Sequence, residues 1–132
     1  MMKIWIICMA ALSLLTGCGA SEKSENSYRQ VSAAEAMEIM EKERGYIILD
    51  VRTVEEYTQA HIPGAICVPN ETIGTDEIPE LSDKEQLILV YCRSGNRSRQ
   101  AAGKLVKLGY TNIVEFGGIN SWTGETVSGS EG

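Results

Sequence analysis

Three short apolar runs constrain the fold of this chain more than any other feature. They cover residues 46–49, 87–91 and 113–116. Each run has strand length, and the first two are almost wholly apolar, as in strands buried on both faces of a parallel sheet. Residues 28–31 and 65–68 give weaker strand signals. We therefore expect a sheet of several strands whose centre is screened from water on both sides.

Helical segments alternate with these runs. Ser32 with Glu35, and Thr53 with Glu56, form capping-box patterns, so we expect one helix after Ser32 that ends by Gly45 and a short one after Thr53 that reaches residue 59. From residue 98, apolar positions recur at helical spacing up to residue 109, whereas residues 69–85 read as a polar loop. This alternation predicts one α/β domain with a mainly parallel central sheet flanked by helices.

The N-terminus reads as a signal sequence over residues 1–17. Lys3 precedes an apolar stretch over residues 4–15, which is shorter than the roughly 20 residues of a membrane-spanning helix. Leu15-Thr16-Gly17-Cys18 resembles the lipobox of bacterial lipoproteins, and an ordinary signal peptide with a chance cysteine is the alternative. The resemblance implies a lipid such as palmitate on Cys18, and an extracytoplasmic protein anchored to the bacterial cell membrane.

The remaining chain divides by composition. Residues 18–27 form a polar tether, residues 28–123 the folded domain, and residues 124–132 a flexible tail. The net charge of −6 argues against nucleic acid as a partner, which would require a basic face. No Cys-x-x-Cys pair occurs and His61 is the single histidine, so neither a zinc site nor another cofactor is expected.

The most informative residue for function is Cys92, which lies between the run at 87–91 and the helix that starts near residue 98. A thiol at a helix N-terminus beside Arg93 and Arg97 has its pKa lowered from about 8.5 to roughly 3.5–7.5. Gly95 permits backbone geometry in which successive N–H groups surround an anion. The loop therefore suits a sulfur anion on Cys92 or a small oxyanion beside it, with an inert buried cysteine as the alternative.

This loop resembles the active-site loop of single-domain rhodanese sulfurtransferases. Further motifs follow that family's order: Asp50-Val51-Arg52, Glu56-Tyr57 with His61-Ile62-Pro63-Gly64-Ala65, and Gly117-Gly118 with Trp122. Ala60 stands where the family usually has glycine. The resemblance covers residues 31–122 and implies a rhodanese-like three-layer domain. The spacing from Cys92 to Arg97 is one residue shorter than in the related cysteine-dependent phosphatases, which favours sulfur over phosphate.

The resemblance also implies roles for individual residues. Cys92 would be the nucleophile that carries sulfane sulfur as a persulfide. An anionic donor such as thiosulfate would supply the sulfur, and cyanide or a thiol would accept it. The residues that would bind substrate are Arg93, Ser94, Gly95, Asn96, Arg97 and Ser98. Four other residues would support the structure: Asp50, Arg52, Glu56 and His61. Among them, Arg52 and Glu56 would form an ion pair.

Cys67 leaves two further possibilities open. It is either a small buried residue or the partner of Cys92 in a disulfide that would switch the activity off. Two alternative functions go with the same sequence. One is a persulfide carrier that serves a partner protein without turnover, and the other is a thiol oxidoreductase that uses Cys67 and Cys92.

Overall fold

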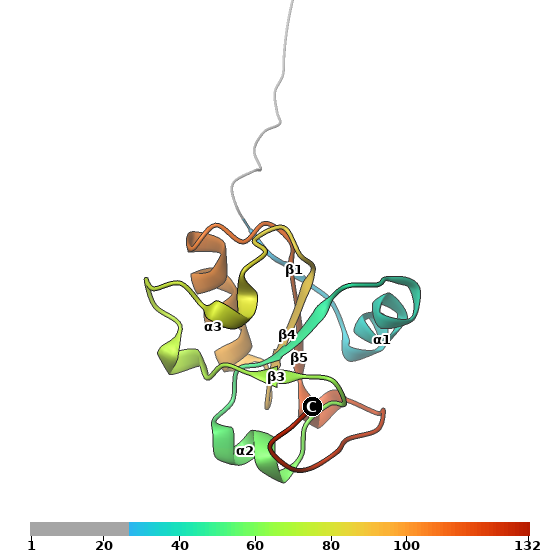
Figure 1. Cartoon of the computed structure of the whole chain (residues 1–132). Coiled ribbons are helices and arrows are strands. Elements are labelled where there is room, and N and C mark those ends of the chain that lie inside the picture. Colours follow the sequence, from blue (N-terminus) through green and yellow to red (C-terminus); the bar gives the residue numbers. More distant parts are fainter. Residues whose placement is uncertain (1–26) are drawn as a thin grey trace, which may run out of the picture.

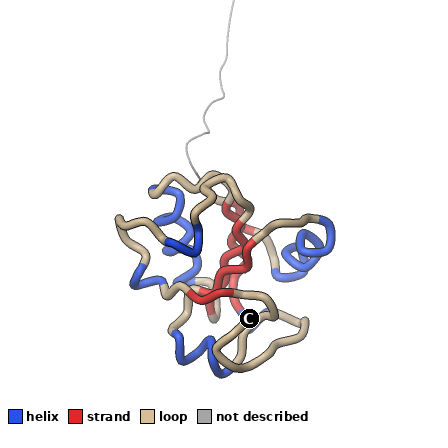
Figure 2. The backbone as a smooth tube through the Cα atoms, in the orientation of Figure 1, coloured by secondary structure: helices blue, strands red, loops and turns tan. Residues whose placement is uncertain are grey.

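The computed structural model describes residues 27–132, which form a five-stranded parallel sheet with helices on both faces (Figures 1 and 2). The strand order is β1-β5-β4-β2-β3, and every pairing is parallel. The strands are β1 (Arg29–Gln30), β2 (Ile47–Asp50), β3 (Ile66–Cys67), β4 (Ile88–Cys92) and β5 (Ile113–Gly118). The predicted α/β class with a mainly parallel sheet is confirmed.

Three α-helices connect the strands: α1 (Ala33–Lys42), α2 (Val54–Gln59) and α3 (Asn96–Lys107). Both predicted capping boxes are present. The Ser32 hydroxyl accepts from the backbone N–H of Glu35 at the start of α1, and that of Thr53 accepts from Glu56 at the start of α2. Each box satisfies two backbone N–H groups that the first turn would otherwise leave unpaired.

The sheet divides the core into two halves. On one face, α3 packs its apolar stripe against alternate strand residues, including Val90 and Cys92. On the other face, α1 and α2 cover Leu89, Tyr91 and Phe116. Figure 1 shows α3 and α1 on opposite sides of the strands. Because β4 is central, all five of its residues are buried, and this explains the continuous apolar run in the sequence.

The segment predicted as a polar loop carries two 3₁₀ turns, η2 (Asn70–Thr72) and η3 (Pro79–Leu81). Ile73, Ile78 and Leu81 are buried in the α3 side of the core. The Tyr110 hydroxyl also donates a hydrogen bond to the Leu81 carbonyl. The segment therefore serves as part of the cover over the sheet.

Two boundaries differ from those expected. Helix α3 begins at Asn96, not near residue 98, because Gly95 takes a positive φ of 112° and turns the chain directly into the helix. Strand β5 continues through Gly118, two residues beyond the apolar run at 113–116 that predicted it. Val90 and Cys92 are two residues apart on β4, but the residues opposite them on β5, Glu115 and Gly118, are three apart. The extra residue on β5 is a β-bulge. A third 3₁₀ turn, η4 (Ile119–Ser121), follows directly.

The C-terminal residues also differ from the predicted flexible tail. Val127 and His61 exchange two backbone hydrogen bonds, of 2.8 and 2.9 Å, and Gly129 N–H donates to the Thr58 carbonyl. The tail thus pairs with backbone groups of Thr58, in α2, and of His61, just after it.

The predicted signal sequence, the predicted lipidation site at Cys18 and most of the predicted tether lie outside the described residues. None of the helices in residues 27–132 has the length and hydropathy needed to cross a membrane.

Candidate active site

Cys92 is the last residue of β4, at the carboxyl edge of the sheet and just before the N-terminus of α3. Its side chain is buried, with 1% of the residue exposed. The loop passes very close to the bulged end of β5. A Cβ added to Gly118 would lie only 2.0 Å from the Arg93 carbonyl oxygen. Only glycine therefore fits at Gly118, and the motif residue is explained by this close approach of two backbones.

The loop directs hydrogen bonds at the sulfur. The Gly95 N–H donates to Cys92 Sγ at 3.0 Å, and Ser98 Oγ lies 3.4 Å from it. Burial of the thiol opposes its ionisation. Hydrogen bonding to the Ser98 side chain and to the backbone N–H groups of Ser98, Gly95 and Ser94 outweighs burial, so the pKa of Cys92 lies below its ordinary value. This arrangement suits a reactive thiolate.

Glu115 is a site residue that the sequence analysis missed. It is 2% exposed, and its Oε2 accepts hydrogen bonds from Ser98 Oγ at 2.5 Å and from the Gly117 N–H at 2.8 Å. The signal that pointed to it was a single acid within the otherwise apolar run at 113–116. A charged residue at a buried strand position indicates a specific polar partner.

Arg97 forms a bidentate ion pair with Glu56, with N–O distances of 2.8 and 3.1 Å. This pair joins α3 to α2 across the mouth of the loop. Hydrogen bonding to the Arg97 guanidinium lowers the pKa of Glu56 to about 2, against the opposing effect of burial. The prediction of an ion pair between Arg52 and Glu56 is wrong, because Glu56 pairs with Arg97 instead.

Arg52 pairs instead with Asp50, two residues before it. The shortest contact, Nη2 to Oδ2, is 2.7 Å, and Nη2 also donates to the Ala60 carbonyl at 2.6 Å. The Tyr91 hydroxyl donates to the same Asp50 oxygen at 2.7 Å and accepts from the Ile62 N–H at 3.1 Å. This buried network fixes the carboxyl ends of β2 and β4 and the turn after α2.

His61 belongs to the same supporting structure. It is fully buried, its ring stacks on Tyr57 at 3.7 Å, and Nδ1 lies 2.8 Å from the Tyr57 carbonyl oxygen. Ala60, where the family usually has glycine, has a φ of −169°. That is extended backbone open to any residue, so the departure leaves the turn unstrained.

The remaining loop residues face outward. Arg93, Ser94 and Asn96 are exposed. Arg93 lines a cavity of about 230 Å³ whose other residues are Arg52, Glu56, Gln59, Ala60 and Ile119. Arg52 is neutralised by Asp50 and Glu56 by Arg97, so the exposed guanidinium of Arg93 leaves a net positive charge beside the cavity, which favours a small anionic ligand.

Cys67 lies away from Cys92. It is on β3, separated from β4 by β2, so the two cysteine backbones are about 10 Å apart at ordinary strand spacing. Their side chains also pack on opposite faces of the sheet. Both thiols are free, and a disulfide needs Cα atoms within about 7 Å. The structure therefore contradicts the hypothesis of a disulfide between them and, with it, the oxidoreductase alternative.

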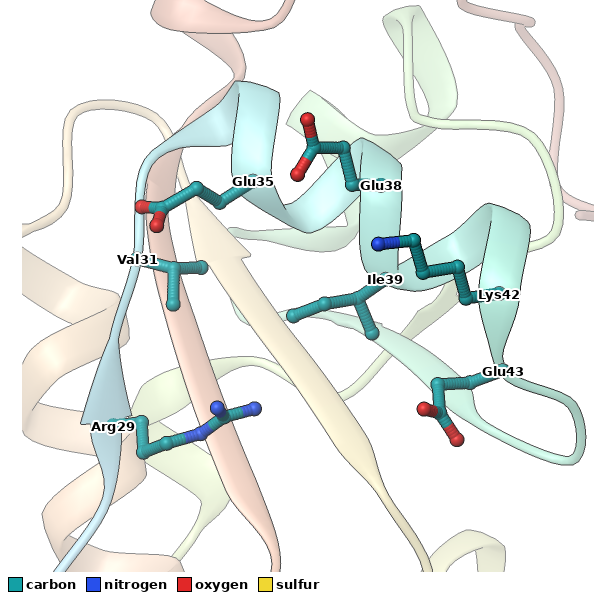
Figure 3. Close-up of a pocket in the computed structure, with 7 residues that line it drawn as sticks. All are labelled: Arg29, Val31, Glu35, Glu38, Ile39, Lys42 and Glu43. Atoms are coloured by element: carbon teal, nitrogen blue, oxygen red, sulfur yellow. The ribbon is translucent and has the colours of Figure 1, made fainter.

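A second cavity, of about 200 Å³, lies between β1 and α1 (Figure 3). Val31 and Ile39 lie among charged side chains of both signs: Arg29, Glu35, Glu38, Lys42 and Glu43. It holds no nucleophile. Within residues 27–132, no three His, Cys, Asp or Glu side chains are grouped so that they could hold a metal ion.

Comparison with known proteins agrees with this geometry. The sequence is 35% identical over 96 residues to "Thiosulfate sulfurtransferase GlpE" of Coxiella burnetii, covering 72% of this chain and 87% of that protein. It is 35% identical to "Thiosulfate sulfurtransferase PspE" of Escherichia coli, covering 61% and 78%. It is 34% identical to "Putative sulfur carrier protein YrkF" of Bacillus subtilis. That match covers 82% of this chain but spans only 59% of YrkF.

Solved structures show the same fold. A rhodanese from E. coli, determined with anions, has a TM-score of 0.59 and 33% identity, over 64% of this chain and 99% of that one. The rhodanese-like domain of Anabaena Alr3790 has a TM-score of 0.69 and 28% identity, over 79% and 82%. The sequence matches the family described as "Rhodanese-like domain" over residues 32–125. This chain therefore belongs to the rhodanese-like domain family.

Proposed function

We propose that this protein is a sulfurtransferase that moves a sulfane sulfur from an anionic donor to a thiophilic acceptor through a persulfide on Cys92. The observation that carries the proposal is the buried Cys92 sulfur, which receives the Gly95 N–H at 3.0 Å and whose pKa is lowered. Relatives named as thiosulfate sulfurtransferases support the same chemistry.

The proposed reaction has two displacement steps. The Cys92 thiolate attacks the outer sulfur of a thiosulfate-like donor, so a bond forms between Sγ and that sulfur. The S–S bond of the donor breaks, and sulfite leaves with the electron pair. Cyanide or a thiolate then attacks the terminal sulfur of the persulfide, and Cys92 leaves as the thiolate. No group beyond the protein and the two substrates is needed, and ping-pong kinetics are expected.

The loop contributes by stabilising charge. The backbone N–H groups of Ser94, Gly95 and Ser98 already act on the sulfur of Cys92, and groups of this kind favour an anion on the added sulfur as well. Arg93 is exposed and lines the cavity of about 230 Å³ beside the loop, where it attracts the anionic donor. Arg97 contributes less free charge than its sequence position suggests, because Glu56 neutralises it.

A second candidate function is a persulfide carrier that passes sulfur to a partner protein. The similarity to YrkF supports it. Both candidates require the Cys92 persulfide, and they differ in whether a small acceptor releases the sulfur catalytically.

The test starts with the intact mass of the purified protein after treatment with thiosulfate. We expect a gain of one sulfur atom in the wild type and in Cys67→Ser, and none in Cys92→Ser. Release of thiocyanate over many turnovers with cyanide then favours the enzyme over the carrier. If Cys92→Ser released thiocyanate at the wild-type rate, the proposed function would be refuted.

We further propose that the protein acts outside the cytoplasm, held to the bacterial cell membrane by a lipid on Cys18. The apolar stretch at residues 4–15 and the lipobox-like sequence before Cys18 support this. Metabolic labelling with a palmitate analogue tests it. Label is expected in the membrane fraction for the wild type, and label that persists in Cys18→Ala would contradict it.

A further inference from the structure

Glu115 lies in a setting that a structural role alone does not explain. It is buried, and it forms no ion pair with any residue of the described part of the chain. Its known partners are the amide of Gln30, at 3.3 Å from Oε1, and the two donors to Oε2, Ser98 Oγ and the Gly117 N–H. An ionised carboxylate without a counter-ion in such a place is costly.

The hydrogen bonds around Ser98 have a defined direction. Its hydroxyl has one hydrogen and four neighbours that can accept it. Glu115 Oε2 is the nearest, at 2.5 Å, followed by the carbonyl oxygens of Gly95 at 3.1 Å and Gly117 at 3.2 Å, and by Cys92 Sγ at 3.4 Å. A distance of about 2.5–2.7 Å is typical of a hydroxyl that donates to a carboxylate.

The thiol of Cys92 is then the donor to Ser98. With the Ser98 hydrogen directed at Glu115, the lone pairs of Oγ are free to accept the Cys92 S–H. The result is a continuous chain from Sγ through Oγ to Oε2, with lengths of 3.4 and 2.5 Å. All three side chains are at least 98% buried, so water does not compete for these hydrogens.

We propose that Glu115 is the proton acceptor for Cys92, acting through the hydroxyl of Ser98. The Cys92 proton passes to Ser98 Oγ as the Ser98 proton passes to Glu115 Oε2. The products are a thiolate, a neutral serine and a carboxylic acid, so the net charge of the site stays at minus one. Ser98 then donates to the thiolate, and Glu115 donates to Ser98. Glu115 is thus a positioning residue that acts through Ser98.

This step matters for catalysis because the substrate is an anion, an argument that rests on the function proposed above. If Glu115 remained ionised beside the thiolate, two buried negative charges would face an anionic donor. Protonation of Glu115 removes one of them before the donor arrives. When the acceptor takes the sulfur away, the proton can return to Cys92 by the same route.

No other charged residue nearby replaces Glu115 as the proton acceptor for Cys92. Arg99 on α3 is exposed, although its Nη1 lies near Gly95. Arg97 is directed at Glu56. From β1 the neighbour of Glu115 is the uncharged Gln30. Glu115 is therefore the only carboxylate within residues 27–132 that is hydrogen-bonded to the cysteine through one side chain.

The test is the pH dependence of alkylation of Cys92 by iodoacetamide, followed on the Cys92 peptide of the full-length protein by mass spectrometry. Two groups that share one proton titrate in two steps, with a level region between them. In the wild type, the rate should change less than threefold between roughly pH 5 and pH 7, which lies between the carboxyl and thiol ranges. Because this assay involves no sulfur donor, its outcome is independent of whether the protein transfers sulfur.

Two variants interrupt the chain at different points. Glu115→Gln keeps the shape but cannot take a proton, and Ser98→Ala removes the link. In each, the rate should fall about tenfold per pH unit below a single midpoint, as for one isolated thiol. Glu38→Gln, on the exposed face of α1, removes one charge elsewhere and should leave the profile unchanged.

Two results would overturn the proposal. One is a Glu115→Gln profile that superimposes on that of the wild type. The other is a wild-type profile that rises through one midpoint only, at whatever pH, in place of two separate steps. The second result needs no variant, so it decides the matter even if Glu115→Gln does not fold.

Discussion

Replacing Gly118 by alanine should disable the active site through a backbone collision. The new Cβ would lie 2.0 Å from the Arg93 carbonyl oxygen, 2.2 Å from the Arg93 carbonyl carbon and 2.5 Å from the Ser94 nitrogen. Contacts of this kind are essentially never shorter than 3.0 Å, so the loop must retreat by about 1 Å. All three atoms belong to backbone, so no side-chain rotation relieves the clash.

The expected loss follows from that displacement. A shift of about 1 Å in a catalytic group costs on the order of 100-fold in rate, or about 2.7 kcal/mol. The Gly95 N–H moves with the loop, so the Cys92 thiolate also loses stabilisation. Overpacking should lower the free energy of unfolding by roughly 1–3 kcal/mol. The assay is kcat/KM for thiocyanate release, with urea unfolding to confirm that the variant is folded.

Gly103→Ala provides a matched control within α3. Its Cβ would have no neighbour within 4 Å. The substitution should raise the free energy of unfolding by about 0.5–1 kcal/mol, because alanine restricts the unfolded chain more than glycine. Activity should stay at the wild-type level. A folded Gly118→Ala protein with kcat/KM within threefold of the wild type would refute the reasoning.

Three further predictions concern the surroundings of the site. The lowered pKa of Glu56 means that its pair with Arg97 stabilises the fold above about pH 4.5, and that this contribution is lost as pH falls towards 2. With partial exposure it amounts to about 1 kcal/mol, so unfolding of the wild type and of Glu56→Gln should differ at pH 7 and converge near pH 2. Tyr91→Phe should cost about 1–3 kcal/mol in urea unfolding, because the buried Ile62 N–H loses its acceptor, and a loss below 0.5 kcal/mol would contradict this. Burial raises the pKa of Cys67 to about 11, so at pH 7 iodoacetamide should label it at least tenfold more slowly than Cys92, as measured by peptide mass mapping, and equal rates would be inconsistent with its setting.

Local patterns in the sequence were enough for most of the fold. The capping boxes at Ser32 and Thr53 involve residues three apart, so they are visible without any tertiary information. The apolar run ahead of Cys92 likewise predicted a central strand, because burial on both faces leaves no polar position. These features depend on neighbours along the chain.

What the sequence could not show depends on contacts across the sheet. Arg52 and Glu56 are spaced for an ion pair along a helix, but Arg52 precedes α2 and turns back to Asp50. Glu56 meets Arg97, 41 residues away. The bulge near Gly117 depends on the register of two strands, which neither strand specifies alone. The same bulge places Gly118 against the loop.

The parallel arrangement of β1 has a consequence for access to Cys92. All strands run in one direction, so the chain enters the domain at the amino edge of the sheet, whereas Cys92 lies at the carboxyl edge. Strand β5, six residues long, runs from one edge to the other and spans about 17 Å at the usual rise per residue. Figure 1 shows the first described residues at one end of the molecule and α2 at the other. The Cys92 loop therefore opens at the opposite end of the sheet from the point at which residue 27 leads into the domain, so a molecule that approaches the loop does not meet that point.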